Sequence, residues 1–371
     1  MAERVLVAMS GGVDSSVAAA RLIEQGFDVV GVTLHLWDYP DDGDAKSRCC
    51  APEDIHDAQR VCDLLGVPHF AFDRRELFQQ EVVKPFVDDY LQGTTPSPCV
   101  RCNRSVKVRE LVAIAARLQA TSVATGHYAR VDLTGPVPKL LRGKDRNKDQ
   151  SYFLHMLDSK TLGRMRFPLG EATKTEVREQ AVRLKLPGAT KGESQELCFV
   201  PTGRYDAFVD ERASGRAKSG AILDFDGKEI GRHEGIHRYT VGQRKNLGVA
   251  LGQRAYVVGV DAERGEVQLG SKEELLARGA VLGEFSLAED LRLPLRCDVG
   301  VRYRGQGFAA LVEPSEAGAR VLFDAPVSAV VPGQVAVLYD GERVLGGGVI
   351  RRALAAHDEG SALRRHLDVV S

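Results

Sequence analysis

A short run of glycines and serines with one aspartate, near the start of the chain, has the composition of a phosphate-binding loop. It follows an apolar run at residues 4–9 and precedes residues 16–25, where apolar side chains recur at helical spacing; the loop residues are Ser10, Gly11, Gly12, Val13, Asp14 and Ser15. In this context glycines let backbone N–H groups approach phosphate oxygens, and the helix N-terminus adds positive potential. Ser10 and Ser15 can donate hydrogen bonds, and Asp14 is suited to holding Mg²⁺.

The ending of the loop separates classes of nucleotide-binding protein. It lacks the Gly-Lys-Ser/Thr ending of a Walker A sequence, which disfavours a kinase or GTPase. It resembles the PP-loop of ATP pyrophosphatases, which activate a carbonyl oxygen as an adenylate and release pyrophosphate. The resemblance implies that the protein binds ATP and cleaves it between the α and β phosphates. The alternative is a tight turn that binds nothing.

Two cysteines form a Cys-Val-Arg-Cys sequence after a proline-rich run. Cys99 and Cys102 follow Thr-Pro-Ser-Pro at residues 95–98, and the prolines predict an extended, exposed loop. A helix is expected over residues 103–118, which would bring its positive end beside Cys102. Arg101 and Arg104 flank the same cysteine. Both effects favour the thiolate, the reactive form of cysteine.

Metal binding is the main alternative for these cysteines. Cys198 is the obvious third thiol, but structural zinc normally takes four ligands, so zinc is disfavoured. A [4Fe–4S] cluster on Cys99, Cys102 and Cys198 with one open iron stays an alternative, as does an incidental buried pair at 99 and 102. The remaining cysteines are expected to have no catalytic role: Cys49, Cys50, Cys62 and Cys297.

Local charge is more informative than total charge. Lys+Arg number 50 and Asp+Glu 51, a balance that neither supports nor excludes a nucleic-acid partner. Residues 101–109 carry four basic side chains and no acid before Arg109, and residues 139–148 carry five basic side chains against one acid. Such clusters suit phosphate contacts to RNA. The alternative is a solvated charged surface.

The element pattern explains how these residues are positioned. Strand-like runs at residues 4–9, 27–36, 69–72 and 122–125 alternate with helical patterns, including 52–65 and 74–91. This alternation predicts an α/β fold with a doubly wound parallel sheet. From about residue 215 short alternating runs and Asp-Gly turns predict two small β domains, divided near residues 275–280.

Nothing in the sequence indicates a membrane or an export route. No stretch approaches the roughly 18 apolar residues of a membrane span, and the N-terminus has no signal or transit pattern. We therefore expect a cytoplasmic protein without membrane contact, whose seven cysteines are not a disulfide framework.

These motifs together resemble one family over nearly the whole chain. The chain is similar to tRNA-specific 2-thiouridylases of the MnmA/TrmU type, on the residues 9–16, 95–103, 124–128, 147–153, 198–199, 240–245 and 346–348. The resemblance implies a PP-loop catalytic domain at residues 1–205, a small central domain at 206–277 and a C-terminal β-barrel at 278–360.

The resemblance also implies roles for individual residues. ATP would be bound by Ala8, Met9, Ser10, Gly11, Gly12, Val13, Asp14, Ser15, Leu34 and Gly126. The tRNA or its target base would be contacted by Ser97, Pro98, Cys99, His127, Lys148, Asp149, Gln150, Arg302, Tyr303 and Gln334. Cys198 would carry a persulfide, and Cys102 would be the partner nucleophile.

The implied reaction is 2-thiolation of the wobble uridine. ATP with Mg²⁺ adenylates the C2 oxygen, sulfur from the persulfide replaces it, and Cys102 forms a transient disulfide with Cys198. Some members have Asp where this chain has Cys99, which keeps the cluster alternative open. A cysteine-desulfurase relay would supply sulfur, and a monomer is expected.

Two other classes share part of the pattern. A PP-loop amide-forming ligase on a small metabolite needs the loop but not the cysteines or basic segments. A non-catalytic RNA-binding or iron–sulfur sensing protein does not need an intact loop at residues 10–15.

Overall fold

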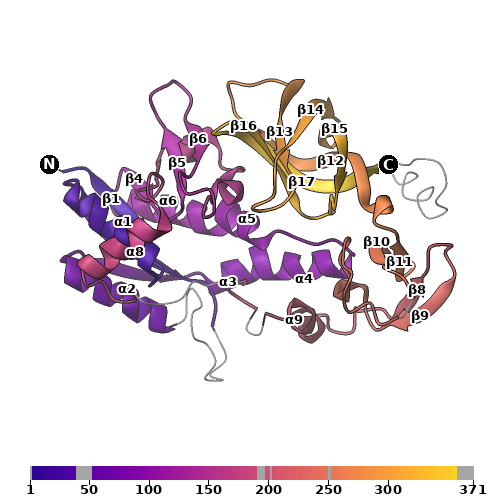
Figure 1. Ribbon diagram of the computed structural model, residues 1–371. Helices are drawn as coiled ribbons and strands as arrows, with labels where there is room; N and C mark the ends of the chain where they lie inside the picture. The colour runs from indigo at the N-terminus through magenta and orange to yellow at the C-terminus, as the bar shows by residue number, and fades with distance from the viewer. Residues whose placement is uncertain (1, 39–51, 190–196, 201–202, 250–251, 357–371) are drawn as a thin grey trace.

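The computed structural model describes residues 2–38, 52–189, 197–200, 203–249 and 252–356. These residues form three sheets: a parallel sheet near the N-terminus, a small mixed sheet and a C-terminal barrel (Figure 1). Cys49 and Cys50, expected to have no catalytic role, lie outside the described residues. Within the described ranges, no helix combines the length and the apolarity needed to cross a bilayer.

The first sheet is five-stranded and parallel, as the alternating pattern predicts. Its order is β3-β2-β1-β4-β7, built from β1 (Arg4–Ala8), β2 (Asp28–His35), β3 (His69–Asp73), β4 (Ser122–Ala124) and β7 (Met165–Arg166). The chain runs outward from β1 to β2 and β3, and then returns to place β4 on the other side of β1. The reversal between β1 and β4 is the point where such sheets bind ligands.

Helices cover both faces of this sheet, which makes it doubly wound. Val5 and Val7 of β1 belong to the core beneath α1 (Val13–Glu24), α2 (Pro52–Leu65) and α8 (Lys174–Arg183). Leu6, which points to the other face, packs with the core of α6 (Val108–Arg117). Alternate side chains of a strand point to opposite faces, so both faces of this strand are apolar.

Two long helical segments contain a π-helical turn each. The first runs through α3 (Arg75–Phe78), η1 (Gln79–Val83) and α4 (Lys84–Leu91), close to the predicted helix 74–91. The second runs through α5 (Pro98–Cys102), η2 (Asn103–Lys107) and α6. The predicted start at residue 103 is therefore wrong. Pro98 occupies the first helical position, where a residue without an N–H is favoured.

The small central sheet is mixed. Its order is β10-β11-β8-β9, with β8 (Gly220–Leu223) and β11 (Glu266–Gly270) parallel and the flanking β9 (Glu229–His233) and β10 (Tyr256–Asp261) antiparallel. It follows α9 (Tyr205–Arg212), and two short 3₁₀ turns, η4 (Ile236–Arg238) and η5 (Glu273–Leu275), flank its strands. The central domain is β-rich, as expected.

The C-terminal strands close into a six-stranded antiparallel barrel through pairing of the first strand with the last. The strands are β12 (Leu276–Leu287), β13 (Leu295–Gly300), β14 (Phe308–Ser315), β15 (Gly318–Ser328), β16 (Val335–Asp340) and β17 (Arg343–Ala355). A hairpin of β5 (Ala129–Asp132) and β6 (Lys139–Arg142) joins β17 from outside, so it extends the barrel sheet from the N-terminal region (Figure 1).

The contact between the N-terminal region and the barrel requires glycine at residue 347. His155, between η3 (Ser151–Leu154) and α7 (Ser159–Leu162), packs its ring against Gly347 of β17. A Cβ at Gly347 would lie 2.6 Å from Cδ2 of that ring. The absence of a side chain at Gly347 therefore lets the two parts of the chain pack closely.

Candidate active site

The phosphate loop has an internally hydrogen-bonded shape that leaves its main chain open to a ligand. The Ser10 amide donates to Ser15 Oγ at 3.1 Å, and Ser15 Oγ donates to the Gly12 carbonyl at 3.0 Å. Gly11 has φ +70°, and a Cβ there would lie 2.5 Å from the Asp54 carbonyl oxygen. Helix α1 begins at Val13, so the amides of its first turn have no acceptor inside the helix and point to an anion site.

A buried lysine reaches this loop from far along the chain. Lys174 Nζ lies 2.7 and 2.8 Å from the two carboxylate oxygens of Asp14, and the Tyr128 hydroxyl donates to Asp14 Oδ1 at 2.8 Å. Lys174 is the first residue of α8 and its side chain is 9% exposed. Sequence reasoning missed this lysine because no local motif marks it. The site therefore holds a positive charge beside the predicted Mg²⁺ residue.

The predicted nucleotide residues gather at the carboxyl ends of β1, β2 and β4. Ala8 ends β1, Met9 follows it and is 3% exposed, and Leu34 lies near the end of β2 at 7% exposure. Gly126 follows β4, and a Cβ there would lie 2.9 Å from the main chain of Asp14 and Ser15. The loop and Gly126 therefore flank the point where the strand order reverses.

His127 is held as a neutral, half-buried imidazole next to Gly126. Its Nδ1 lies 2.7 Å from Thr125 Oγ1. Burial, with a smaller contribution from the nearby Lys107, lowers the pKa of His127 to about 3. The ring is therefore uncharged at neutral pH and does not attract RNA phosphates by charge.

The three residues predicted at 148–150 have different surroundings. Asp149 is buried, and its carboxylate accepts from Arg142 Nε at 2.8 Å and from the Gly143 and Ser151 amides. Gln150 Oε1 accepts from the Tyr128 amide at 3.0 Å. Both side chains hold the turn that follows β6, while Lys148 is half-buried at its edge. The turn, more than these two side chains, is available to a ligand.

The cysteine segment differs from the extended loop predicted for it. Cys99 is exposed in the first turn of α5, and Cys102 is 5% exposed one turn later. Burial raises the pKa of the Cys102 thiol to about 11, because the opposing effect of Lys107 is smaller than the cost of desolvation. The predicted thiolate at Cys102 is therefore wrong for this conformation. Arg104 pairs with Glu284 at 3.1 Å instead.

The π-helical turn at Asn103–Lys107 begins directly after Cys102. The Lys107 amide donates to the Cys102 sulfur, which the wider turn makes geometrically accessible. Asn103 Nδ2 donates to the Phe153 carbonyl at 3.3 Å and ties the helix to η3. Turns of this kind are frequent at functional sites.

Cys198 is positioned by its neighbour Phe199. The Phe199 ring packs with centroid separations of 5.6, 5.0 and 5.4 Å on Phe78, Phe86 and Phe208. Cys198 itself is half-buried at the edge of the same core that contains Cys102. Cys102 and Cys198 are both thiols in this structure.

The iron–sulfur alternative requires the thiols of Cys99, Cys102 and Cys198 to lie together. Over the part of the chain that the structure describes, no three side chains of His, Cys, Asp or Glu lie together in a way that could hold a metal ion. Cys99 is exposed while Cys102 is buried. In this arrangement the three thiols are not placed as the ligands of one cluster.

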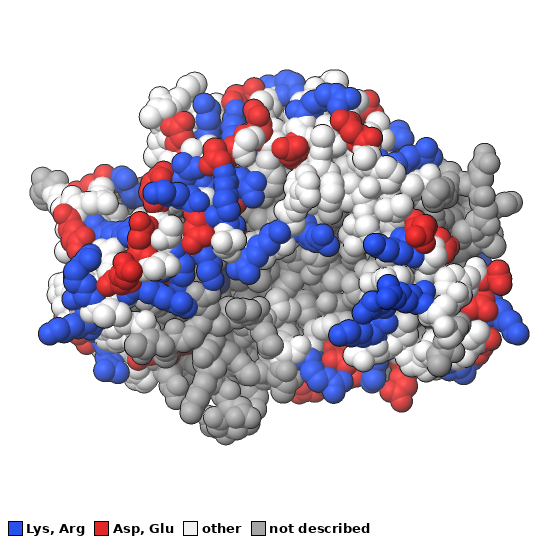
Figure 2. Space-filling model, viewed as in Figure 1, with Lys and Arg blue, Asp and Glu red and all other residues white. Residues whose placement is uncertain are grey.

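Basic side chains lie around the sites predicted for tRNA. Arg302 is exposed, and Tyr303 packs on Phe153 with a centroid separation of 4.5 Å. They border a cavity of about 120 Å³ that Arg142 and Arg146 also line. Lys and Arg side chains gather over the N-terminal domain with its β5–β6 hairpin and, separately, over the central domain (Figure 2).

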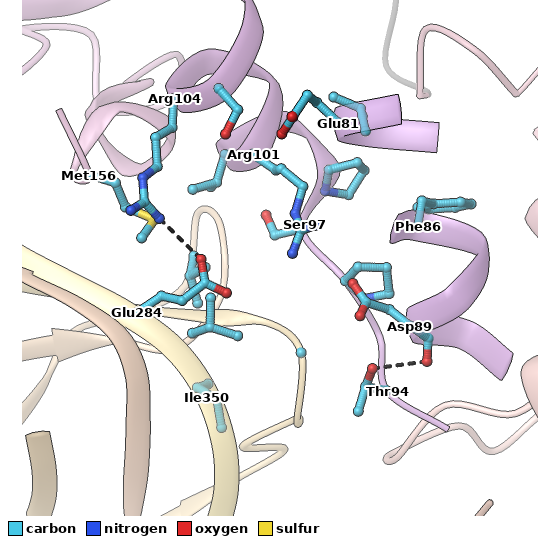
Figure 3. Close-up of a pocket in the computed structure, with 18 of the residues that line it drawn as sticks. Glu81, Phe86, Asp89, Thr94, Ser97, Arg101, Arg104, Met156, Glu284 and Ile350 are labelled. Atoms are coloured by element: carbon cyan, nitrogen blue, oxygen red, sulfur yellow. Dashed lines mark hydrogen bonds and ion pairs between the residues drawn. The ribbon is translucent and has the colours of Figure 1, made fainter. Parts of the chain in front are cut away.

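Helix α5, which bears Cys99 and Cys102, is called the cysteine helix below. A larger cavity of about 380 Å³ separates it from the barrel. Ser97 and Arg101 line it from the helix side, and Glu284 and Ile350 from the barrel side (Figure 3). Gln334, predicted to contact tRNA, donates from Nε2 to the Thr95 and Pro96 carbonyls beside this cavity.

A phosphate loop at the reversal of a parallel sheet, without the Walker A ending, defines a PP-loop nucleotide-binding domain. Three family models match in chain order: the tRNA methyl transferase HUP domain at residues 3–202, the tRNA methyl transferase PRC-barrel domain at 207–271 and the aminomethyltransferase beta-barrel domain at 278–350.

Two relatives align with this chain over nearly its whole length. The tRNA-specific 2-thiouridylase MnmA of Sorangium cellulosum is 58% identical over 357 residues, covering 95% of this chain and 93% of the relative. The protein of the same name from Geobacter metallireducens is 47% identical, covering 95% of this chain and 98% of the relative. The chain belongs to the MnmA family of tRNA-specific 2-thiouridylases, and its HUP domain implies the use of ATP.

Proposed function

We propose that this protein transfers sulfur to C2 of the wobble uridine of tRNA, and consumes ATP to AMP and pyrophosphate. The observation that carries the proposal is a series of hydrogen bonds between the two ends of the site. Tyr128 donates from its hydroxyl to Asp14 of the nucleotide loop and from its amide to Gln150, the residue before η3. Asn103, directly after Cys102, donates to the Phe153 carbonyl of η3. The nucleotide end and the thiol end of the site are therefore neighbours, as adenylation followed by sulfur attack on the same carbon requires.

The loop and its partners supply the adenylation half of the reaction. The first-turn amides of α1, with Ser10 and Ser15, bind phosphate oxygens, and Lys174 adds positive charge beside them. Asp14 is 34% exposed in the loop, and a single carboxylate together with ATP phosphates is a usual Mg²⁺ environment. Bound Mg²⁺ would neutralise charge on those phosphates.

The cysteines supply the sulfur half. The terminal sulfur of a Cys198 persulfide attacks C2, the C–O bond breaks and AMP leaves with the electron pair. The Cys102 thiolate then attacks Cys198 Sγ, so that a Cys102–Cys198 disulfide forms and the sulfur left on the base becomes the thiocarbonyl. A thiol reductant resets the disulfide, and a sulfur-donor protein reloads Cys198. Because Cys102 is protonated and buried here, the segment that bears it must open before this step.

The test is a reconstituted reaction with ATP, Mg²⁺, a persulfide donor and unmodified tRNA. We expect 2-thiouridine by nucleoside mass spectrometry, and we expect Cys102→Ser and Cys198→Ser each to abolish it. Cys297→Ser, at a half-buried cysteine in the barrel, is the matched control and keeps activity. Pyrophosphate release that depends on a small amine, with no thiolated base, would support the amide ligase instead.

The tRNA contacts and the partners of the protein are proposed on the same basis. The tRNA contacts three places: the turn at Lys148, the start of the cysteine helix at Ser97 and Cys99, and the barrel at Arg302 and Tyr303. We further propose a monomer in the cytoplasm that receives sulfur from a cysteine-desulfurase relay.

A further inference from the structure

The segment just before the cysteine helix is held by parts of the chain from two other domains. From the barrel, the Pro332 carbonyl accepts from the Thr95 amide at 2.9 Å. Gln334 Nε2 donates to the carbonyls of Thr95 and Pro96 at 2.9 and 3.2 Å. From the central domain, Thr240 Oγ1 accepts from Thr95 Oγ1 at 3.3 Å.

Gly333 brings the barrel turn against the main chain of the same segment. It has φ +89°, and a Cβ there would lie 2.8 Å from the N, C and O atoms of Thr95. The turn is itself fixed to β17, since the Gly333 amide donates to the Ile350 carbonyl and the Ile350 amide donates to the Gln334 carbonyl, each at 2.8 Å. A rigid strand therefore supports the contact.

A movement of Thr95 would also move the thiols, because only a short stretch of backbone joins them. Pro96 and Pro98 restrict the backbone torsions between Thr95 and the start of α5, so the helix has little freedom to move independently of Thr95. Cys99 and Cys102 lie in the first turns of that helix. The cavity drawn in Figure 3 leaves space beside the helix into which it could shift.

We propose that Gln334 and Gly333 are positioning residues that set where the cysteine helix begins. Both hydrogens that Gln334 donates go to main-chain carbonyls of the cysteine segment. The importance of that position rests on the proposed function, because it matters for sulfur transfer only if Cys102 is the partner nucleophile.

The experiment measures alkylation of Cys102 by iodoacetamide, residue by residue with peptide mass spectrometry, without tRNA or ATP. In the parent protein Cys102 reacts slowly because it is buried. We expect Gln334→Ala and Gly333→Ala each to speed the alkylation of Cys102 about tenfold. This factor corresponds to a loss of about 1.4 kcal/mol in the free energy that favours the buried position of the thiol. Gly227→Ala is the matched control, because that glycine also has positive φ, +79°, but a Cβ there meets nothing within 4 Å.

The steady-state kinetics give a second readout. A positioning role predicts that Gln334→Ala lowers kcat for thiolation as well as any effect it has on the KM for tRNA. Unchanged Cys102 alkylation with a raised KM and an unchanged kcat would overturn the proposal and limit Gln334 to a tRNA contact. If Gly333→Ala does not fold, as judged by circular dichroism, Gln334→Ala decides alone. Because alkylation needs no catalysis, absence of thiolation would contradict the proposed function without affecting this result.

Discussion

At the scale of single residues, the nucleotide loop depends on a lysine that the local sequence does not reveal. Lys174 is separated from Asp14 by 160 positions, yet both oxygens of that carboxylate are within 2.8 Å of its ammonium group. A buried lysine beside an aspartate in a phosphate loop has two partners available, the carboxylate in the absence of nucleotide and the phosphates in its presence. Its position therefore suits stabilisation of the charge that develops on pyrophosphate.

We predict that Lys174→Met lowers ATP-dependent pyrophosphate release by about 10²-fold, the usual effect of removing one preorganised group that stabilises developing charge. The measurement is tRNA-dependent pyrophosphate release at saturating ATP. Lys160→Met is the control, since Lys160 is exposed on α7. Parent-level release by the Lys174 variant would limit this lysine to a structural ion pair.

At the scale of elements, the sequence patterns predicted which strands and helices exist better than they predicted the residue at which a helix begins. The strands at residues 4–9, 27–36, 69–72 and 122–125 are all confirmed. Those at 4–9, 27–36 and 122–125 are buried parallel strands with apolar runs, and the one at 69–72 is a largely exposed edge strand. The start of the cysteine helix was wrong by five residues, 103 against Pro98. Pro98 was interpreted as a loop residue, although proline equally suits the first helical position. That error also misplaced the charge argument for Cys102.

The element that carries Cys198 depends on one aromatic anchor. Phe199→Ala removes a fully buried ring from a cluster of four other aromatic side chains, which costs about 3–5 kcal/mol. We predict that Cys198 then reacts faster with iodoacetamide and that single-turnover sulfur transfer slows, because the thiol loses its fixed position. Phe323→Ala, in the barrel core, serves as the control for lost stability alone. Equal effects of both variants on Cys198 would contradict the anchoring role.

At the scale of the whole molecule, the N-terminal region and the barrel share one sheet, because the β5–β6 hairpin pairs with β17. No sequence pattern could predict this pairing, since it rests on a long-range strand contact and on the close approach of His155 to Gly347. The same limit applies to residue roles. Asp149 lies in a motif and Gln334 was predicted from the family resemblance, but the side chains of both bind protein groups, which only the tertiary structure shows.

The arrangement leaves exposed basic side chains of the barrel as the better candidates for RNA contact, and Arg302 is the clearest of them. A single phosphate contact contributes about 0.7 to 0.9 to the slope of log Kd against log salt. We therefore predict that Arg302→Ala weakens tRNA binding and lowers that slope by about this amount in filter-binding titrations. Arg60→Ala is the control, because Arg60 is 71% exposed on α2, across the sheet from the cysteine helix. A parallel shift of the two salt titrations, with equal slopes, would mean that Arg302 supports the loop around Tyr303 and does not neutralise a phosphate.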